Sequence, residues 1–256
     1  MLAIARLVAA AVYIIFMTLF ALIYCLFSPR NPKHVYFFCR WFSQLHKLIG
    51  LKIIQRGLEH APTPNNSVYI SNHQSVFDFV TAPGMLRPRT VSLGKKELLW
   101  VPFFGQLYWI TGNILINRED KSKARDTIKQ VAEAIHQRNL SVWAYPEGTR
   151  SKGRGLLPFK SGAFRMAIEA GVPITPMVVS TTHNKIHLNR RNNGIVITEM
   201  LAPIDTSHYN LKDARALAEH CHQLMKAKIA ELDEEVIQLE EQQKRNSLVE
   251  NNSANQ

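Results

Sequence analysis

The sequence has few cysteines and lacks several common catalytic signatures. Its three cysteines, Cys25, Cys39 and Cys221, lie far apart, with neither the density of a disulfide scaffold nor the spacing of a metal site. A P-loop is absent because the spaced glycines are not followed by Lys-Ser/Thr, and the G-x-S-x-G elbow of many hydrolases is also missing. These absences argue against a disulfide-rich secreted domain, a P-loop nucleotide site and a hydrolase. The reducing cytoplasm is therefore the expected compartment for most of the chain.

Acidic residues are scarce relative to basic ones. The 256 residues include 31 Lys+Arg and 20 Asp+Glu, which gives a formal net charge of +11. A chain this basic favours an anionic partner, which is nucleic acid, an anionic membrane surface or a phosphorylated substrate. Composition alone leaves these three classes open.

Charge is missing altogether between Leu7 and Phe27, a run of 21 residues. As a helix this run is about 31 Å long, close to the roughly 30 Å thickness of bilayer hydrocarbon. A signal peptide would have a shorter apolar stretch and a small-residue cleavage site, whereas SPRNPKH follows here. The run therefore predicts a retained membrane anchor, and it favours a membrane over nucleic acid as the anionic partner.

Positive charge is concentrated after this run. Arg6 precedes it, and the cations that follow are Arg30, Lys33, Arg40 and Lys47. The positive-inside rule then places the downstream chain in the cytoplasm; a helix lying within one leaflet is the alternative to a spanning one. Residues 36–51 mix aromatic rings with cations. That composition fits a helix at the membrane interface and, equally, an amphipathic helix packed on the domain.

Beyond residue 50, short apolar runs alternate with helical periodicity. We expect strands at 67–71, 90–93, 140–145, 173–180 and 194–201. We expect helices at 78–86, 122–138, 161–170 and 211–243. The alternation predicts an α/β fold with a largely parallel or mixed sheet flanked by helices. The predicted organisation is a membrane-associated helical segment (1–50), an α/β domain (51–210), a C-terminal helix (211–243) and a disordered tail (244–256).

The stretch NHQSVFD places His73 and Asp78 five positions apart, just after a predicted strand. In a regular helix the two side chains would point about 140° apart, so they meet only if His73 lies on a loop or a first turn. A carboxylate on one ring nitrogen would fix the histidine tautomer and stabilise the imidazolium, which describes a general base for a hydroxyl. Alternatives are a hydrogen-bonded structural histidine and a metal ligand, although compatible further ligands are not evident nearby.

Two other stretches have unusual composition. Residues 145–164 (YPEGTRSKGRGLLPFKSGAF) combine several cations with glycines that allow a ligand close to the backbone, as in a phosphate site; a solvated basic loop is the alternative. Residues 94–118 begin and end with cations and are apolar and aromatic between them. This second stretch fits core, the lining of an acyl-chain groove, or a surface resting on lipid.

These motifs together resemble those of bacterial 1-acyl-glycerol-3-phosphate acyltransferases, within the wider glycerolipid acyltransferase family. The resemblance covers most of the chain and includes NHQSVFD, GNILINR, YPEGTR, GRGLLPFKSGAF and GVPITP. The order H-x-x-x-x-D and then E-G-T-R, about seventy residues apart, is specific where either motif alone is not.

The resemblance assigns roles by position. It implies that His73 is the base, that Asp78 orients it, and that Pro173 and Pro176 shape the site. The residues implied to bind the glycerol phosphate are Lys95, Lys96, Arg118, Glu147, Gly148, Thr149 and Arg150. The family often has aspartate before the arginine of its second motif, whereas this chain has Asn117. Any contact that needs a carboxylate at position 117 is therefore in doubt.

The resemblance further implies a reaction. An acyl group passes from acyl-carrier protein or acyl-CoA, the co-substrate thioester, to the sn-2 hydroxyl of lysophosphatidate, giving phosphatidate without a metal or other cofactor. Expected partners are that carrier and anionic membrane lipid, with no nucleic acid. The expected location is the bacterial cytoplasmic (inner) membrane, with the catalytic domain facing the cytoplasm. Alternatives are acylation of another lysophospholipid or of glycerol 3-phosphate, and a non-catalytic membrane protein that binds anionic lipid.

Overall fold

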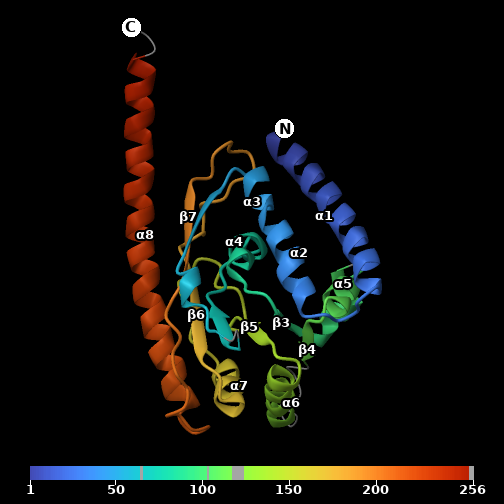
Figure 1. The fold of residues 1–256 in the computed structure, drawn as a ribbon. Coiled ribbons are helices and arrows are strands. Elements are labelled where there is room, and N and C mark those ends of the chain that lie inside the picture. Colours follow the sequence, from blue (N-terminus) through green and yellow to red (C-terminus); the bar gives the residue numbers. More distant parts are fainter. Residues whose placement is uncertain (64–65, 103, 117–123, 254–256) are drawn as a thin grey trace.

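A seven-stranded sheet forms the centre of the computed structural model, which describes residues 1–63, 66–102, 104–116 and 124–253 (Figure 1). The strand order is β1-β7-β6-β2-β5-β3-β4. The strands are β1 (Lys52–Arg56), β2 (Val68–Ser71), β3 (Thr90–Lys95), β4 (Ile114–Ile116), β5 (Ser141–Ala144), β6 (Ile174–Val179) and β7 (Ile195–Met200). All neighbouring pairs are parallel except β6 and β7, which are antiparallel. The α/β class and the mixed sheet that the sequence predicts are thus confirmed.

Helices cover both faces of this sheet. The α-helices are α1 (Leu2–Leu26), α2 (Lys33–Ser43), α3 (Leu45–Leu48), α4 (Asp78–Thr81), α5 (Phe104–Ile110), α6 (Ala124–Gln137), α7 (Gly162–Ala170) and α8 (Ala214–Ser253). Short 3₁₀ helices are η1 (Leu58–His60), η2 (Pro83–Met85) and η3 (Lys96–Trp100). Every residue of β2 and β6 is buried, as expected for central strands covered on both sides. Their continuous apolar runs therefore lie in the middle of the sheet.

The core divides between the two faces of the sheet. Residues of α6, α7 and α8, including Ile135, Phe164 and Leu217, pack with one set of strand side chains. On the other face Leu51 and Met85 pack with the opposite set. Alternation along a strand explains this division, because successive side chains point to opposite faces.

Two strands were not predicted. β1 lies at one edge of the sheet beside β7, and β4 is a three-residue strand at the other edge. Both lie within or next to segments that the sequence interpretation assigned to helix, loop or apolar surface. Edge strands of this length have too few residues to display a clear alternation, and pairing with a neighbour decides their conformation.

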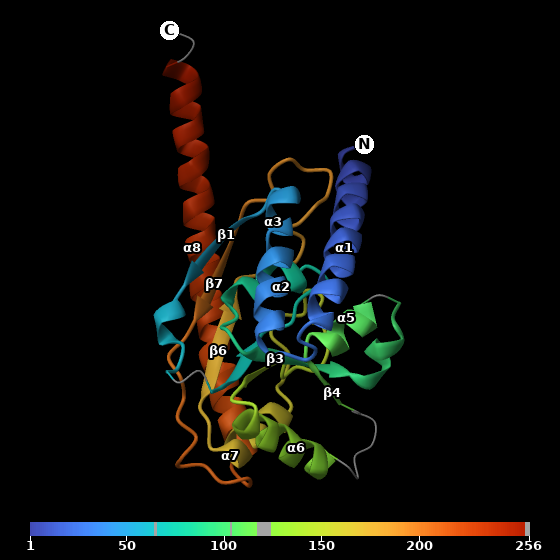
Figure 2. The same cartoon turned by 45° about the vertical axis from the view of Figure 1, so that its right-hand side comes forward.

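The C-terminal helix is longer than predicted. The sequence predicts a helix ending at Gln243 and a disordered tail over 244–256, whereas α8 runs to Ser253 and extends beyond the sheet (Figures 1 and 2). Residues 241–248 are all exposed, so no packing holds this part of the helix. Glutamate, glutamine, lysine and arginine are good helix formers, and their propensity carries the helix onward where polar composition alone indicates a tail.

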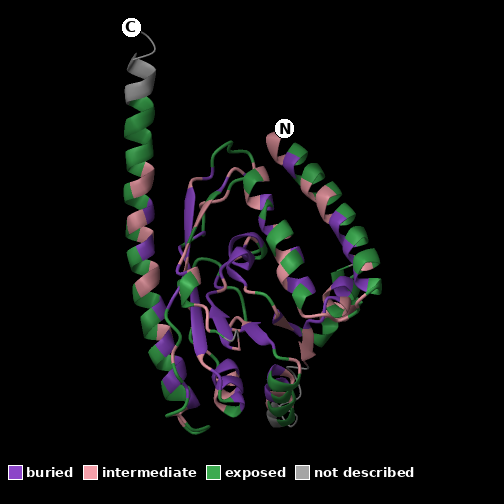
Figure 3. Ribbon diagram, viewed as in Figure 1, coloured by how far each residue is buried: buried purple, intermediate pink, exposed green. Residues whose placement is uncertain are grey.

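The apolar N-terminal run forms one helix, α1, which lies along the side of the domain. Its mean hydropathy is 2.5, and it is the one helix in the described part of the chain that is long and apolar enough to cross a membrane. Met17, Ala21 and Cys25 face inward, against Phe38 of α2 and Leu107 of α5. Most of its other large side chains are exposed, as the green outer surface of the helix shows in Figure 3.

The N-terminal turn of α1 is tied to the domain through Arg6. This guanidinium is buried and donates hydrogen bonds to the carbonyl oxygens of Leu188, Arg190 and Arg191. At the other end of α1, the Arg30 N–H donates to Ile110 O over 2.7 Å. Both ends of α1 are therefore attached to the domain.

The predicted interfacial helix over 36–51 is divided between α2 and α3. Val35 and Phe38 of α2 are buried against the domain and α1, whereas Phe37 and Trp41 remain exposed. α2 thus packs on the domain, as one interpretation requires, and also presents aromatic rings outward; contact of those rings with a membrane stays a prediction.

Candidate active site

The two motifs meet because they follow neighbouring parallel strands. β2 and β5 are paired with Ile70 opposite Ala144, so the residues after each strand leave the sheet at the same edge. His73 follows β2 by two residues, and Tyr145 to Glu147 follow β5. The two motifs are about seventy residues apart in the chain, and the pairing of β2 with β5 brings them into direct contact.

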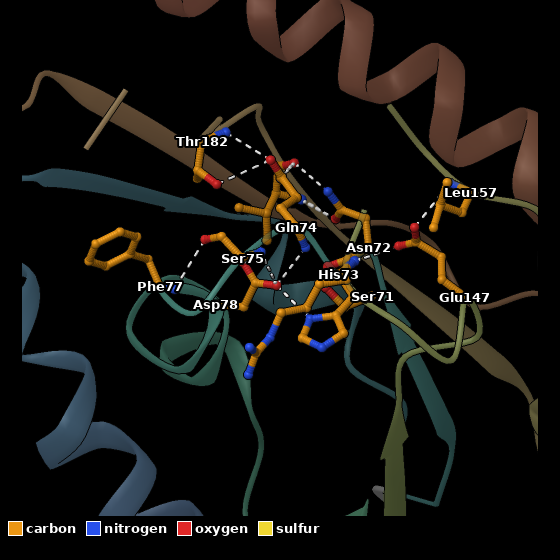
Figure 4. Close-up of polar contacts among 12 residues, drawn as sticks. Ser71, Asn72, His73, Gln74, Ser75, Phe77, Asp78, Glu147, Leu157 and Thr182 are labelled. Carbon is orange, nitrogen blue, oxygen red and sulfur yellow. Dashed lines mark hydrogen bonds and ion pairs between the residues drawn. The ribbon is translucent and has the colours of Figure 1, made fainter. Parts of the chain in front are cut away.

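Backbone hydrogen bonds join the loops after these strands. The Ser151 N–H donates to His73 O over 2.8 Å, and the Lys152 N–H donates to Gln74 O over 3.0 Å. The buried Asn72 amide fixes the same loop to β6, because its Nδ2 donates to Val179 O and its Oδ1 accepts from the Val179 N–H. The histidine loop is thus held from both neighbouring strands (Figure 4).

The predicted contact between His73 and Asp78 is present. His73 Nδ1 lies 2.6 Å from Asp78 Oδ2, and Asp78 is the first residue of α4, so the histidine lies on the corner before the helix. The carboxylate also accepts the N–H groups of Gln74 and Ser75. Because a carboxylate accepts, Nδ1 carries the proton in this contact, and the lone pair of the neutral ring is on Nε2. The imidazole side chain is 20% exposed, whereas that of Asp78 is 5% exposed.

The Glu147 side chain points toward the backbone of the loops around the site and accepts hydrogen bonds from it. Its Oε1 accepts the His73 N–H over 2.6 Å, and its Oε2 accepts the Leu157 N–H over 3.0 Å. Burial raises the pKa of this carboxyl, which these two donors partly oppose. The resemblance implies a contact between Glu147 and the glycerol phosphate. The geometry instead gives both oxygens to backbone donors, so the side chain braces the loop that bears His73.

Tyr145 is a site residue that the sequence interpretation did not single out. Its ring stacks on the His73 imidazole, with centroids 4.0 Å apart and planes at 17°, and its centroid lies 4.9 Å from that of the Trp143 ring. Burial, reinforced by Asp78, raises the pKa of the phenol well above its usual value, so the ring beside the imidazole is neutral. The position just before P-E-G-T-R was the available signal, because that residue directly follows β5 at the same edge of the sheet as His73.

A cavity of about 710 Å³ opens beside this pair. His73, Asp78, Tyr145 and Arg150 line one part of it, and its remaining walls are mostly apolar side chains of α1, α2, α4 and α5. A second cavity, of about 260 Å³, lies behind the histidine loop and is lined by Glu147 among others. A long apolar pocket with a few converging polar groups is the usual form of a site for an amphipathic ligand.

The predicted phosphate-binding cations are placed unequally. Arg150 lines the large cavity with His73. Lys95 ends β3 at the same edge of the sheet and Lys96 begins η3; both are exposed, and neither lines that cavity. Thr149 is exposed beside Arg150. Arg118, with Asn117, lies outside the described residues.

Gly148 has a specific steric role in this loop. Its φ is +71°, and a Cβ at this position would lie 2.7 Å from Lys160 Nζ. The glycine therefore lets the Lys160 ammonium lie directly over the backbone of E-G-T-R. Lys160 belongs to the basic stretch that the sequence singled out, although it was not among the assigned phosphate ligands.

The two prolines implied to shape the site are not brought to it. Pro173 precedes the amino end of β6, and Pro176 pairs with Ile70 in the middle of the sheet. Because the strands are parallel, the start of β6 lies at the edge opposite His73. Pro173 O instead accepts the Val68 N–H, which fixes the register of β2. In the described part of the chain, no group of three or more His, Cys, Asp or Glu side chains is arranged to hold a metal ion.

Comparison with known proteins agrees with this arrangement. The profile of the Acyltransferase family matches residues 52–180, a range that includes both motifs. The chain belongs to the acyltransferase family. It is 55% identical to the 1-acyl-sn-glycerol-3-phosphate acyltransferase of Escherichia coli strain K12, over 94% of this chain and 98% of the relative. The enzyme of the same name from Haemophilus influenzae is 53% identical, over 84% of this chain and 89% of its own length.

More distant acyltransferases share the fold. The human 1-acyl-sn-glycerol-3-phosphate acyltransferase alpha is 32% identical over 83% of this chain. The crystal structure of the 1-acyl-sn-glycerophosphate acyltransferase from Thermotoga maritima superposes with a TM-score of 0.71 at 23% identity, covering 90% of this chain and 94% of that one. The overall fold is therefore common to both structures.

Replacing Glu147 with glutamine tests the bracing of the histidine loop. The glutamine side chain has one accepting oxygen and one NH₂ group. One of the two backbone N–H groups that Glu147 accepts, from His73 or Leu157, therefore faces another donor. We expect a loss of about 1–3 kcal/mol in the free energy of unfolding and a fall in acyl transfer, measured by denaturant unfolding in detergent and by initial rates. Glu133→Gln, at an exposed position of α6, is the matched control. Equal stability of both variants would contradict the bracing role.

Replacing Tyr145 tests the stack on His73. Tyr145→Phe keeps the ring and should retain most of the transfer rate. Tyr145→Leu removes the ring from one face of the imidazole, so His73 is held less well. We expect kcat to fall by about tenfold or more, with little change in the KM for the acceptor, because misplacement of a catalytic group slows the chemical step. Steady-state kinetics of the two variants provide the measurement. Equal kcat values for leucine and phenylalanine would show that the stack has no part in positioning His73.

Proposed function

We propose that this protein transfers an acyl group from an acyl thioester to the sn-2 hydroxyl of 1-acyl-glycerol 3-phosphate, forming phosphatidate. The observation that carries the proposal is the His73–Asp78 pair, which opens onto a mostly apolar cavity of about 710 Å³ beside Arg150. A base, a cation and apolar walls are what a phosphorylated lipid alcohol needs. The names of the bacterial relatives at 53–55% identity support the same acceptor.

His73 acts as the base in this reaction. Its Nε2 takes the proton of the lipid hydroxyl while the hydroxyl oxygen attacks the thioester carbonyl carbon. Asp78 holds Nδ1–H and stabilises the imidazolium that forms. The carbon–sulfur bond then breaks, and the imidazolium returns the proton to the departing sulfur, giving the free thiol. Tyr145 and Glu147 hold the ring and the backbone of His73 in place.

The transfer is direct, with no acyl-enzyme intermediate. Cys39 is the one cysteine that lines the cavity, and burial raises the pKa of its thiol to about 12. A thiol with this pKa is almost entirely protonated near neutral pH and is a poor nucleophile. Ser75 lies on the rim, where its hydroxyl accepts the Phe77 N–H and supports the turn.

Arg150 binds the phosphate of the acceptor, because its guanidinium lines the cavity beside His73 and its fork of donors fits phosphate oxygens. The family resemblance also implies Lys95, Lys96 and Arg118, but neither lysine lines the cavity and Arg118 lies outside the described residues, so Arg150 is the phosphate ligand proposed here. The apolar part of the cavity, between α1, α2 and α5, takes an acyl chain. Binding both ends of the lipid places its hydroxyl next to the imidazole.

The acyl donor is the thioester of acyl-carrier protein or of CoA. Lys152, Arg154 and Lys160 extend the charge of Arg150 along one exposed loop, and none of the four makes an ion pair with another described residue. This is more positive charge than one phosphate monoester requires. It fits a donor that carries several negative charges, as both carriers do. Initial rates with the two thioesters compare them directly.

The enzyme acts at the cytoplasmic face of the bacterial inner membrane. Support for the membrane location comes from the exposed apolar surface of α1 and from its length, and the cations that follow it suit an anionic lipid surface. With Arg6 bound to the 188–191 loop, the start of α1 stays against the domain, so the helix lies along one leaflet instead of crossing the bilayer. This arrangement brings the cavity to the membrane, where lysophosphatidate is located.

His73→Ala tests the base. Purified protein in mixed micelles is incubated with labelled acyl thioester and lysophosphatidate, and phosphatidate is quantified. Loss of a positioned base lowers the rate by about 10²–10⁴-fold, while the melting temperature stays close to that of the parent. His208→Ala, at an exposed position, should retain full activity. Turnover of His73→Ala within a few-fold of the parent would refute the base assignment.

Arg150→Ala tests the phosphate contact. Loss of a charge-assisted hydrogen bond should raise the KM for lysophosphatidate by about ten- to a hundredfold. The rate with an uncharged monoacylglycerol as acceptor, measured in the same micelles, should differ little between the parent and Arg150→Ala. Arg215→Ala removes an exposed cation from the start of α8 and is the matched control. An unchanged response to lysophosphatidate concentration would remove Arg150 from the phosphate site.

A further inference from the structure

One exposed apolar surface is not explained by the active site. It lies on the segment formed by η3, α5 and the residues between them, called here the η3–α5 segment (96–102 and 104–110). Its four large exposed side chains are Trp100 (81% exposed), Val101 (43%), Phe104 (49%) and Trp109 (46%). Apolar side chains scattered singly on a surface are ordinary, but four within ten residues mark an interaction surface.

The η3–α5 segment is firmly packed on its inner side. A Cβ on Gly105 would lie 2.3 Å from Leu99 O, so η3 rests directly on the first turn of α5. Leu107 is buried against Met17 and Phe38. The outward side chains are therefore held in place by a fixed backbone. They are exposed because nothing in the described part of the chain covers them.

This surface is continuous with the outer face of α1. The two helices pack together through Leu107 and lie side by side in both ribbon views (Figures 1 and 2). The Arg30 guanidinium lies 5.1 Å from the ring centroid of Trp109, at the junction between α1 and α5. The exposed apolar side chains of α1 and those of the η3–α5 segment thus lie on neighbouring elements.

The flanking charges identify the partner. Lys95 and Lys96 are exposed where η3 begins, and neither makes an ion pair with another described residue. Tryptophan rings next to lysine and arginine are typical of protein surfaces at the level of lipid headgroups. A protein partner would have to cover α1 as well, whereas a bilayer covers both surfaces at once.

We propose that the η3–α5 segment is a second membrane-contacting element, in addition to α1 and α2. Trp100, Val101 and Trp109 enter the headgroup region of a bilayer that contains anionic lipid, with Lys95 and Lys96 against its phosphates. This inference rests on the proposed membrane location of the enzyme. It adds that the rim of the catalytic cavity itself touches lipid, since Pro102 and Phe104 line that cavity. A lysolipid chain then passes from the leaflet into the cavity without crossing water.

The four tryptophans of the chain provide the test. Variants that keep only Trp41, Trp100 or Trp143, with phenylalanine at the other positions, are bound to vesicles of equal parts phosphatidylcholine and phosphatidylglycerol. The lipids carry bromine high on the acyl chain, which quenches nearby indoles. We expect quenching of Trp100 to match that of Trp41 on α2, with weaker quenching of Trp143, which is 7% exposed and lines the inside of the cavity. If a triple variant does not fold, lipid quenching is measured for the parent and for Trp100→Phe. The difference between the two is the quenching of Trp100.

A second experiment measures affinity. Trp100→Ser should weaken binding to the same vesicles by about tenfold, and Trp100→Phe should restore most of it. Ile237→Ser removes a similarly exposed apolar side chain from α8, across the sheet from α5, and should leave vesicle binding unchanged. Transfer in detergent micelles should be the same for the parent and Trp100→Ser, because Trp100 does not line the cavity.

The outcomes separate this inference from the proposed function. Quenching of Trp41 without quenching of Trp100 overturns the inference and leaves the membrane location intact. Protection of Trp100 from both brominated lipid and aqueous iodide indicates a protein partner and also overturns it. If no tryptophan is quenched and vesicles do not bind the protein, the proposed membrane location is wrong. The proposed acyl transfer is tested separately, by phosphatidate formation in micelles.

Discussion

The parallel pairing of β2 with β5 is the contact on which the rest of this molecule's chemistry depends. It brings His73 and the E-G-T-R loop to one edge of the sheet, and the bonds from Ser151 and Lys152 to the histidine loop then lock them together. Each further feature of the site builds on this arrangement. Glu147 can reach the His73 N–H, and Tyr145 can stack on the imidazole, only because the two strands end side by side. Buried, satisfied hydrogen bonds of this kind rigidify a site, because breaking any one of them leaves an unpaired group.

Around this polar centre the protein builds an apolar enclosure from elements outside the sheet. α1, α2 and α5 provide most of the walls of the cavity, and their outward sides remain apolar as well. In the proposed function, one set of helices serves both the lipid substrate and the membrane. The attachment of Arg6 to the 188–191 loop keeps α1 close to the domain, so that the enclosure and the catalytic edge stay together.

The sequence predicted several features well, and each had a strong local signal. The central strands β2 and β6 are continuous apolar runs bounded by polar residues, and α1 is a long charge-free segment. Helix geometry required a corner between strand and helix for His73 to meet Asp78, the family resemblance implied that the two act together, and the structure has the contact. Weaker local signals gave errors. β1 and β4 at the sheet edges were missed, and the exposed end of α8 was predicted as a disordered tail although its residues favour helix.

The sequence by itself determined the α/β class, the apolar N-terminal helix, and the two motifs that contain His73, Asp78 and Arg150. These depend on periodicity, length and residue type, which are local properties. Only the tertiary structure decided which of those residues meet. It gave both Glu147 oxygens to backbone donors, placed Pro173 at the far edge of the sheet, and set Tyr145 against His73. Strand order and register determine such contacts, and they depend on pairings between segments far apart in the chain, which no local pattern records.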